Sequence, residues 1–292
     1  MTSLLIDSHG VGYAAHYAIR GLLHDGSETG IPFGFFWSIL NLAEQFKTNR
    51  FIFCWDGGAK GRKQIFPEYK ISRKPTTEKE REEKKGIHIQ FDAMRKDILP
   101  SVGFKNIVQQ YGYESDDLIA KIIDENPDKR FVIVSQDHDL FQLLRYKNCS
   151  MMVSPNGRKK TTASSFALEY GIPAREWSLV KAIAGCDSDG VPGIPGVGIK
   201  TAIKYLNRQI DPIKTVSRRI ETSGEYINRN FKLVYLPFPG AKVPEIQEEK
   251  FDQDKLFQMF DDLGFESFLK GDERDRWELF CRGYEKMRQI KR

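Results

Sequence analysis

The chain has 292 residues, a formal net charge of +5 from 45 Lys and Arg against 40 Asp and Glu, and a hydrophobic fraction of 40%. That fraction supports a packed core, which excludes disorder as the main state, and the length suits one extended or two small domains. No run approaches the roughly 18 uninterrupted apolar residues of a membrane span, and the start, MTSLLIDSHG, lacks a basic leader region. We therefore expect a protein that is neither secreted nor a partner of membranes.

Cysteine and histidine usage excludes two further classes. The four cysteines lie far apart and form no CxxC pair, and the five histidines form no HxxxH pair. Neither a disulfide framework nor a zinc site is indicated, which favours a reducing, cytoplasmic compartment.

Three short β-rich runs each lead into an aspartate: SLLI into Asp7, FIFCW into Asp56 and FVIVSQ into Asp137. Helical spacing at 31–46 and 116–125 predicts a β-α-β order, and long connections of this kind favour a parallel sheet. In open parallel sheets, ligands bind beyond the carboxyl ends of the strands. We therefore expect the three aspartates to converge at one edge.

Two further segments complete the predicted fold. FKNIVQQ, at 104–110, predicts another strand, and from about residue 162 the pattern is helical, with Gly and Pro between 185 and 198. The predicted class is α/β, with a mostly parallel central sheet flanked by helices.

The positive charge is concentrated in residues 60–74 (KGRKQIFPEYKISRK), which hold six Lys or Arg and one Glu. Basic side chains interleaved with Phe66 and Tyr69 suit a phosphate backbone and a stacking base, although a solvated loop can have the same composition. The next segment, TTEKEREEKK, has i,i+4 charge pairs and no apolar residue, so it predicts a helix that projects into solvent. We expect residues 60–86 to form a mobile cap.

Acidic residues gather at the predicted strand ends and helix starts. Helix capping needs one acid, whereas the ESDD run supplies three. At an effective dielectric constant of about 20, each like-charged pair near 4 Å opposes folding by roughly 4 kcal/mol, so cations must offset the repulsion. Oxygen donors select Mg²⁺ or Mn²⁺, and two such ions about 4 Å apart suit phosphoryl transfer. The nine candidate metal ligands are Asp7, Asp56, Glu114, Asp116, Asp117, Asp137, Asp139, Asp187 and Asp189.

A glycine-rich hairpin at 190–206 (GVPGIPGVGIKTAIKYL) separates two helical runs. Its glycines allow a backbone to approach a phosphate, and the following helix offers free N–H groups and two lysines. A dinucleotide fingerprint is the competing interpretation, but Thr201 replaces its last glycine and no strand precedes the motif. A plain Gly-Pro turn between packed helices is the other alternative. The candidate DNA-binding residues here are Gly193, Gly196, Gly198, Lys200 and Lys204.

Together these motifs resemble the 5′ nuclease (flap endonuclease) family, which includes the 5′-3′ exonuclease domain of bacterial DNA polymerase I and its bacteriophage relatives. The resemblance runs in family order through LLIDSHG, FCWDGG, GRKQIFPEYKISRK, ESDDLIA, SQDHDLFQLL, AGCDSDGVPGIPGVGIKTA and RNFKLVYLP. It implies a metal-dependent phosphodiesterase in a bacterial or phage-infected cell. It also implies a helical arch, a helix-three-turn-helix that binds duplex DNA, and K⁺ held in that motif.

The resemblance also implies individual roles. Asp7, Asp56, Glu114, Asp116 and Asp137 match a first metal cluster, with Asp117 lining the same pocket; Asp139 and Asp189 match a second, with Asp137 near both. Arg62, Lys70 and Arg73 match arch-base positions that contact the scissile phosphate. Tyr69 matches the neighbouring aromatic position for a terminal base.

One position departs from the family pattern. Cys186 stands where family members usually have an aspartate, so an oxygen ligand has become sulfur. A hard divalent ion gains little from a thiol, so either Asp187 takes the role or the second metal site is weaker.

We therefore expect a two-domain 5′-3′ exonuclease and flap endonuclease. Residues 1–179 would form the nuclease core, with the arch at about 60–90, and residues 180–292 the duplex-binding region, with its hairpin motif at 185–206. The candidate catalytic residues are Asp137, Lys70 and Arg73, and the expected cofactors are two Mg²⁺ or Mn²⁺ ions. We expect a monomer whose partner is branched or 5′-flapped DNA. Replication proteins are further candidate partners. The rivals are a branched-DNA-binding protein weakened in catalysis through Cys186, and a single-strand RNase, which would not need the hairpin.

Overall fold

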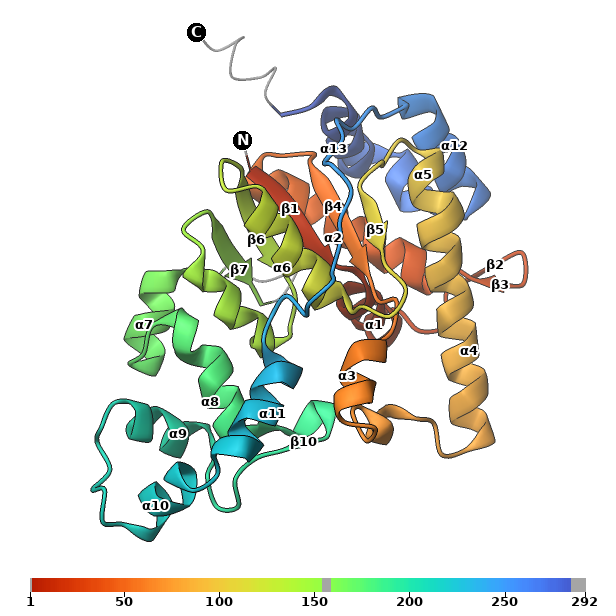
Figure 1. The fold of residues 1–292 in the computed structure, drawn as a ribbon. Coiled ribbons are helices and arrows are strands. Elements are labelled where there is room, and N and C mark those ends of the chain that lie inside the picture. The colour runs from red at the N-terminus through yellow and green to blue at the C-terminus, as the bar shows by residue number, and fades with distance from the viewer. Residues whose placement is uncertain (1, 154–158, 285–292) are drawn as a thin grey trace, which may run out of the picture.

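The computed structural model describes residues 2–153 and 159–284. A six-stranded sheet lies at its centre in the order β5-β4-β1-β6-β7-β8 (Figure 1). All neighbouring strands are parallel except β8, which is antiparallel to β7. The strands are β1 (Thr2–Asp7), β4 (Phe51–Trp55), β5 (Ile107–Gln109), β6 (Arg130–Val134), β7 (Cys149–Met152) and β8 (Lys160–Thr161). The predicted mostly parallel sheet, with its strand near 104–110, is confirmed.

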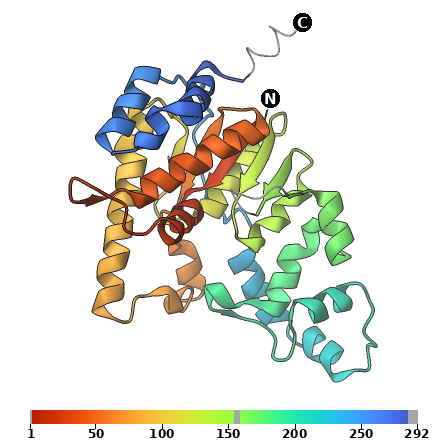
Figure 2. The same ribbon diagram turned by 180° about the vertical axis from the view of Figure 1, so that it is seen from behind.

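Alternate side chains of the central strand enter two separate cores. Leu4 and Ile6 of β1 belong to the core under α2 (Gly30–Phe46), whereas Leu5 belongs to the core under α6 (Ser115–Glu125). This alternation follows from the period of two in a β-strand, and the strands lack polar alternation because helices cover both faces. The view in Figure 2 shows α2 crossing one face of the sheet.

The segment from 60 to 93 forms the arch at the carboxyl edge of the sheet. It consists of α3 (Lys60–Ile65), the 3-10 turn η1 (Ile71–Arg73) and α4 (Glu78–Ala93). A capping box between Thr77 and Glu80 starts α4, whose first eight residues are almost all exposed, as their composition predicts. Its second half is anchored, because Ile87 and Phe91 join the core.

The remaining described elements surround this frame. The helix continues from α4 through the π-turn η2 (Met94–Ile98) into α5 (Leu99–Ser101), and α1 (Ser8–Ala18) packs on α2. The others are β2 (Leu23–His24), β3 (Ser27–Glu28), η3 (His138–Arg145), α7 (Ala163–Tyr170), η4 (Ala174–Glu176), α8 (Trp177–Ala184), β9 (Gly185–Cys186), η5 (Asp187–Asp189), β10 (Val191–Pro192), α9 (Ile199–Leu206), α10 (Thr215–Glu221), α11 (Gly224–Val234), α12 (Gln253–Asp262), η6 (Glu266–Leu269) and α13 (Gly271–Arg282).

Two details after residue 162 correct the expectation of continuous helix. The short strands β9 and β10 pair antiparallel, so a strand does precede Gly193, and residues 235–252 run without helix or strand. The absence of a preceding strand therefore no longer argues against a dinucleotide fingerprint. Thr201 still does, as does the two-residue length of β10, which belongs to no parallel sheet.

The last helices return to the nuclease core. Phe260 of α12 and Trp277 of α13 pack with Phe36 of α2, and Figure 1 shows both helices at the opposite end from α9 and α10. The expected domain boundary at 179 falls inside α8. The division into two domains stays a prediction. Within residues 2–153 and 159–284, no helix combines the length and apolar content that a membrane crossing requires.

Candidate active site

The three strand-end aspartates lie at one edge of the sheet. Asp7 ends β1 and Asp56 follows β4, and Ser115 bridges them: its hydroxyl donates to Asp7 Oδ1 at 3.1 Å and its backbone N–H to Asp56 Oδ1 at 2.8 Å. The Ser135 hydroxyl donates to Asp7 Oδ2 at 2.8 Å and accepts from the Asp137 N–H at 3.0 Å. The predicted convergence of the three acids is therefore seen.

Mutual repulsion marks this group of carboxylates. Burial, then the charges of Asp56 and Asp137, raise the pKa of Asp7 to about 6. Burial and the neighbouring Asp137 and Asp7 also raise the pKa of Asp116 well above its ordinary value. Carboxylates that repel one another in a half-buried site are stabilised by a cation, so this oxygen donor set fits hard divalent ions.

Glu114, which the resemblance assigns to the first metal cluster, is engaged by side chains of the arch. It precedes α6, and its carboxylate contacts the Lys70 ammonium and accepts from the Tyr69 hydroxyl at 2.9 Å. The same hydroxyl lies 2.8 Å from Asp189 Oδ2. Tyr69 is only 2% exposed, so it links two carboxylates and offers no free ring face to a terminal base. Here the structure disagrees with the role implied for Tyr69.

Arg62 and Asp117 form a buried bidentate ion pair, with N–O distances of 2.6 and 2.7 Å. Arg62 also donates to the Leu233 carbonyl, and Asp117 accepts from the backbone N–H of Glu114 and Phe238. Arg62 is 3% exposed and Asp117 is fully buried. Because their polar atoms are already engaged, this geometry opposes a phosphate contact for Arg62 and a metal-ligand role for Asp117.

A second acidic group lies beside the first. Asp139, Cys186 and Asp189 are buried, and their candidate ligand atoms lie within 4.8 Å of one another, the one such group in the part of the chain that the structure describes. The Cys186 thiol donates to Asp139 Oδ2 at 3.3 Å, and Lys181 of α8 lies 2.8 Å from Asp139 Oδ1. Burial and these carboxylates raise the pKa of the Cys186 thiol to about 12.

Asp187 does not replace the missing family aspartate. It lies exposed on η5, outside the group formed by Asp139, Cys186 and Asp189. The one-residue shift that the sequence left open is therefore not seen: the backbone of the β9–β10 pair directs Cys186 inward and Asp187 outward.

Two arch cations reach this second group. The Lys70 ammonium lies 3.4 Å from Asp189 Oδ1, and the Arg73 guanidinium lies 2.7 Å from the same oxygen. Burial works against the charge of Lys70, but Glu114 and Asp189 raise its pKa above the ordinary value. Both candidate catalytic cations therefore stay charged at the junction of arch and acids.

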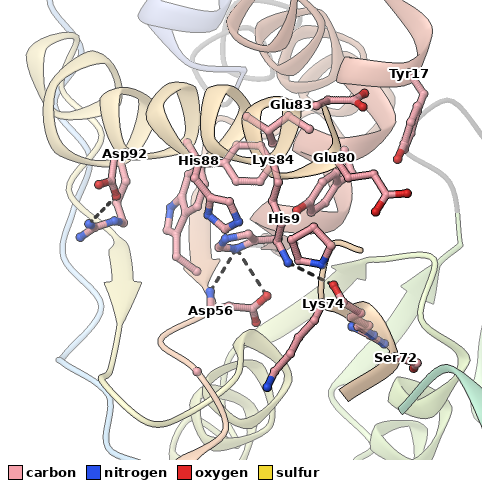
Figure 3. Close-up of a pocket in the computed structure, with 18 of the residues that line it drawn as sticks. His9, Tyr17, Asp56, Ser72, Lys74, Glu80, Glu83, Lys84, His88 and Asp92 are labelled. Atoms are coloured by element: carbon pink, nitrogen blue, oxygen red, sulfur yellow. Dashed lines mark hydrogen bonds and ion pairs between the residues drawn. The ribbon is translucent and has the colours of Figure 1, made fainter. Parts of the chain in front are cut away.

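A cavity of about 750 Å³ opens between the arch and the sheet edge (Figure 3). Asp56 lies on its floor and Lys84 and His88 of α4 on its opposite wall. The Asp56 N–H donates to His9 Nδ1 at 3.1 Å, so that nitrogen carries no proton, and burial lowers the pKa of His9. The cavity joins exposed cations to the acidic edge.

The glycine-rich hairpin begins beside the second acidic group, where Val191 pairs with Cys186, and leads from there into α9. A Cβ at Gly193 would lie 2.0 Å from the Ala184 carbonyl oxygen, so this glycine serves close packing rather than a phosphate contact. Gly196, at φ +78°, and Gly198 are exposed, as are Lys200 and Lys204. These four residues form an accessible surface, which we call the hairpin face.

Sequence reasoning missed several residues of the site. Ser115 and Ser135 orient Asp7, His9 orients Asp56, and Lys181 neutralises Asp139. The only sequence signal was position: each serine lies within two residues of a candidate acid, and Lys181 is in the last turn of the helix before Cys186.

A family model described as "5'-3' exonuclease, N-terminal resolvase-like domain" matches residues 2–171. The chain belongs to this 5′-3′ exonuclease family. The match covers more than half of the chain and includes the arch and all the strand-end acids. It confirms the resemblance to the 5′ nuclease family that the sequence motifs indicated.

Curated relatives support the assignment. The chain is 27% identical to a 5′-3′ exonuclease of Buchnera aphidicola, over 85% of this chain and 80% of the relative. It is 26% identical to DNA polymerase I of Caldicellulosiruptor bescii, over 92% of this chain and 33% of that protein. The chain therefore spans about a third of the length of that polymerase.

Solved structures share the fold. The T5 5′-exonuclease with bound zinc superposes with a TM-score of 0.69 at 18% identity, over 91% of this chain and 99% of that one. A T5 flap endonuclease in a complex with DNA and metal ions gives a TM-score of 0.68 at 19% identity, over 91% of this chain and 98% of that one.

Proposed function

We propose that this chain is a divalent-metal-dependent 5′ nuclease that hydrolyses phosphodiesters near the 5′ ends of branched or nicked DNA during replication or repair. The observation that carries the proposal is the convergence of strand-end and helix-start acids beneath a basic arch. Such a site combines hard oxygen donors with cations that can accept a phosphate. Membership in a family of 5′-3′ exonucleases supports the reaction class.

The residues divide into groups by what they contact. Asp7, Asp56, Asp116 and Asp137 would hold one divalent ion, Mg²⁺ or Mn²⁺, and Asp139 and Asp189 would hold a second. Bound ions of this kind activate water and stabilise the leaving oxygen. Arg62 and Asp117 instead fix the arch base to α6 through their buried pair. Tyr69 positions Glu114 and Asp189.

Lys70 and Arg73 would neutralise charge on the phosphate. Both lie where the arch meets the acids, and each already contacts carboxylate oxygens through N–O distances of 2.7 to 3.4 Å. An anionic phosphate can compete for the same N–H donors, because guanidinium and ammonium groups bind both anions. The side chains would hold the scissile group and stabilise its developing charge.

The hairpin face would bind the duplex away from the cleavage site. Gly196 and Gly198 leave the backbone of the turn accessible, and Lys200 and Lys204 lie at i,i+4 on α9. The same proposal includes a K⁺ ion in the hairpin, a monomeric state, a cytoplasmic location and contacts with replication proteins.

The test uses a 5′-flapped duplex labelled at its 5′ end, with Mg²⁺ titrated and the product ends mapped. The Asp137→Asn variant should lose cleavage by at least about 100-fold while it keeps its affinity for the flap, because the change removes charge at the metal cluster only. Asp128→Asn, the same chemical change at an exposed turn, is the matched control and should cleave normally. Robust Mg²⁺-supported cleavage by Asp137→Asn would refute the assignment.

A branched-DNA-binding protein with weakened catalysis is the second candidate. The observation in its favour is Cys186, which puts sulfur in the second acidic group. Wild-type protein that binds the flap but cleaves it with neither Mg²⁺ nor Mn²⁺ would support this alternative.

A further inference from the structure

Cys186 is held in the second acidic group by the backbone around it. It ends β9 opposite Val191 of β10, and the close approach of Gly185 and Gly193 leaves no room for side chains between these segments. The residue is 3% exposed and packs with Tyr69 and Ala182. The position of its sulfur is therefore fixed by the fold rather than by a flexible loop.

The sulfur points at carboxylate oxygen. Cys186 Sγ lies 3.3 Å from Asp139 Oδ2, and the Ser188 hydroxyl lies 3.2 Å from the same sulfur. Asp189 completes a group of three donors within 4.8 Å. One sulfur and two carboxylates at this spacing can all reach one ion.

A sulfur donor changes which ion such a group prefers. Mg²⁺ takes oxygen ligands almost exclusively, whereas Zn²⁺ binds cysteine, histidine and carboxylate together. A thiol ligand must also lose its proton to solvent on binding, and thiophilic ions drive this exchange far better than hard ions do. The other two donors, both carboxylates, are hard ligands, so the preference for a thiophilic ion depends on Cys186 alone.

We propose that Asp139, Cys186 and Asp189 form a mixed carboxylate–thiolate site that selects Zn²⁺-like ions over Mg²⁺. The two metal clusters of the protein then differ in chemistry: the strand-end acids are an all-oxygen site, and the second is thiophilic. Lys181 contacts Asp139 and Arg73 contacts Asp189, so positive side chains lie beside both carboxylates of the group. This inference rests on the proposed function only in taking the second acidic group as a metal site.

The test titrates Cd²⁺ and, separately, Co²⁺ into the full chain, reduced with a phosphine rather than a thiol reagent. The wild type should develop an ultraviolet sulfur-to-metal charge-transfer band that saturates at about one ion per chain. Cys186→Ser and Cys186→Asp should lack the band. Cys281→Ser, which removes a partly buried thiol of α13 outside the site, should keep it.

Two further measurements use the same proteins. Cys186→Asp should bind Mg²⁺ at least about tenfold more tightly than the wild type, because it restores an all-oxygen group. In the wild type, Zn²⁺ should slow alkylation of Cys186, mapped by mass spectrometry, whereas Mg²⁺ should not. The alkylation assay uses only the wild type, so a folding defect in either Cys186 variant would not affect its result.

The outcomes separate the inference from the proposed function. No band with either ion, a band that survives in Cys186→Ser, or equal protection by Mg²⁺ and Zn²⁺ would overturn the inference, even if the wild type cleaves flapped DNA with Mg²⁺. A Cys186-dependent band in a protein that cleaves no DNA with any divalent ion would instead support this site and refute the nuclease proposal.

Discussion

Asp7 illustrates how the site opposes the stability of the protein that contains it. Its pKa of about 6 in the folded chain exceeds the ordinary 3.8 through burial and the charges of Asp56 and Asp137. The folded state thus binds the proton more tightly than the unfolded state. Stability is unaffected by this group below pH 3.8, falls as the pH rises to about 6, and stays lower above that by about 3 kcal/mol.

Replacing Asp7 with asparagine should therefore stabilise the protein in the absence of divalent ions. With EDTA present, we expect Asp7→Asn to raise the free energy of unfolding by about 2–3 kcal/mol near pH 7.5 and by little near pH 4. The amide can still accept one serine hydroxyl and donate to the other. Urea unfolding at the two pH values measures the effect, with Asp128→Asn as the neutral control. Added Mg²⁺ should stabilise the wild type more than the variant.

Asp117 differs from Asp7 because the Arg62 guanidinium already pairs with its carboxylate. We expect Asp117→Asn to lower the free energy of unfolding by about 3 kcal/mol, since it leaves the Arg62 guanidinium buried without its bidentate partner. Glu78→Gln breaks the exposed pair with Arg81 and should change stability by less than about 1 kcal/mol. If Asp117→Asn unfolds at the wild-type urea concentration but loses Mg²⁺ binding, Asp117 is a metal ligand after all.

At the scale of elements, α4 has two halves with different environments. Its first eight residues are almost all exposed, and the half that contains Ile87 and Phe91 is packed against the core. Gly86 lies at the junction, and apart from its chain neighbours and the adjacent helix backbone no heavy atom lies within 4 Å of the place where its Cβ would be. A glycine inside a helix weakens it by up to about 1 kcal/mol relative to alanine, so the exposed half can fray from this point.

Filling that position should make the arch more rigid. We expect Gly86→Ala to slow amide hydrogen exchange across residues 78–86 about fivefold, in line with a gain of about 1 kcal/mol in helix stability. Gly12→Ala provides the contrast: its Cβ would lie 2.3 Å from Cε1 of Phe91, which should destabilise the packed half of α4 by about 1–3 kcal/mol. Faster exchange in Gly86→Ala would show that the segment needs glycine at this position.

The sequence predicts the elements better than it predicts the site contacts. Apolar runs that end in aspartate identify β1, β4 and β6, because a buried parallel strand is a short continuous apolar run, and the long connections between the runs favour parallel pairing. Residue type alone does not reveal burial: Tyr69 and Arg62 have the composition of a DNA contact, yet both are enclosed by carboxylates from distant segments. Lys181 was missed because its partner Asp139 is brought near only by the fold.

On the scale of the whole molecule, exposed or anion-binding cations occur at two separate places, the arch base and the hairpin face. At the carboxyl edge of the sheet the arch cations Lys70 and Arg73 contact the acids, whereas α9, which carries the lysines of the hairpin face, lies on the other side of α8 (Figure 1). A polyanion can therefore be held at two places while only one of them contains the acidic clusters. Affinity for duplex and cleavage chemistry should then be separable by mutation.

The hairpin face offers the cleanest separation. We expect Lys200→Gln/Lys204→Gln to weaken binding to a flapped duplex and to reduce the slope of log K against log salt by about 1.8, as the loss of two phosphate contacts requires. Binding is measured in the Asp137→Asn background, which keeps the substrate whole. Single-turnover cleavage at saturating protein, measured with active Asp137, should be unchanged.

A matched pair of lysines tests whether position rather than net charge matters. The side chains of Lys255 and Lys270 are 70% and 72% exposed, and these residues belong to the C-terminal segment of α12 and α13, at the opposite end of the molecule from α9 (Figure 1). Lys255→Gln/Lys270→Gln removes the same charge, so it should leave the salt slope at the wild-type value. Equal slopes for the two double variants would mean that the duplex does not contact α9.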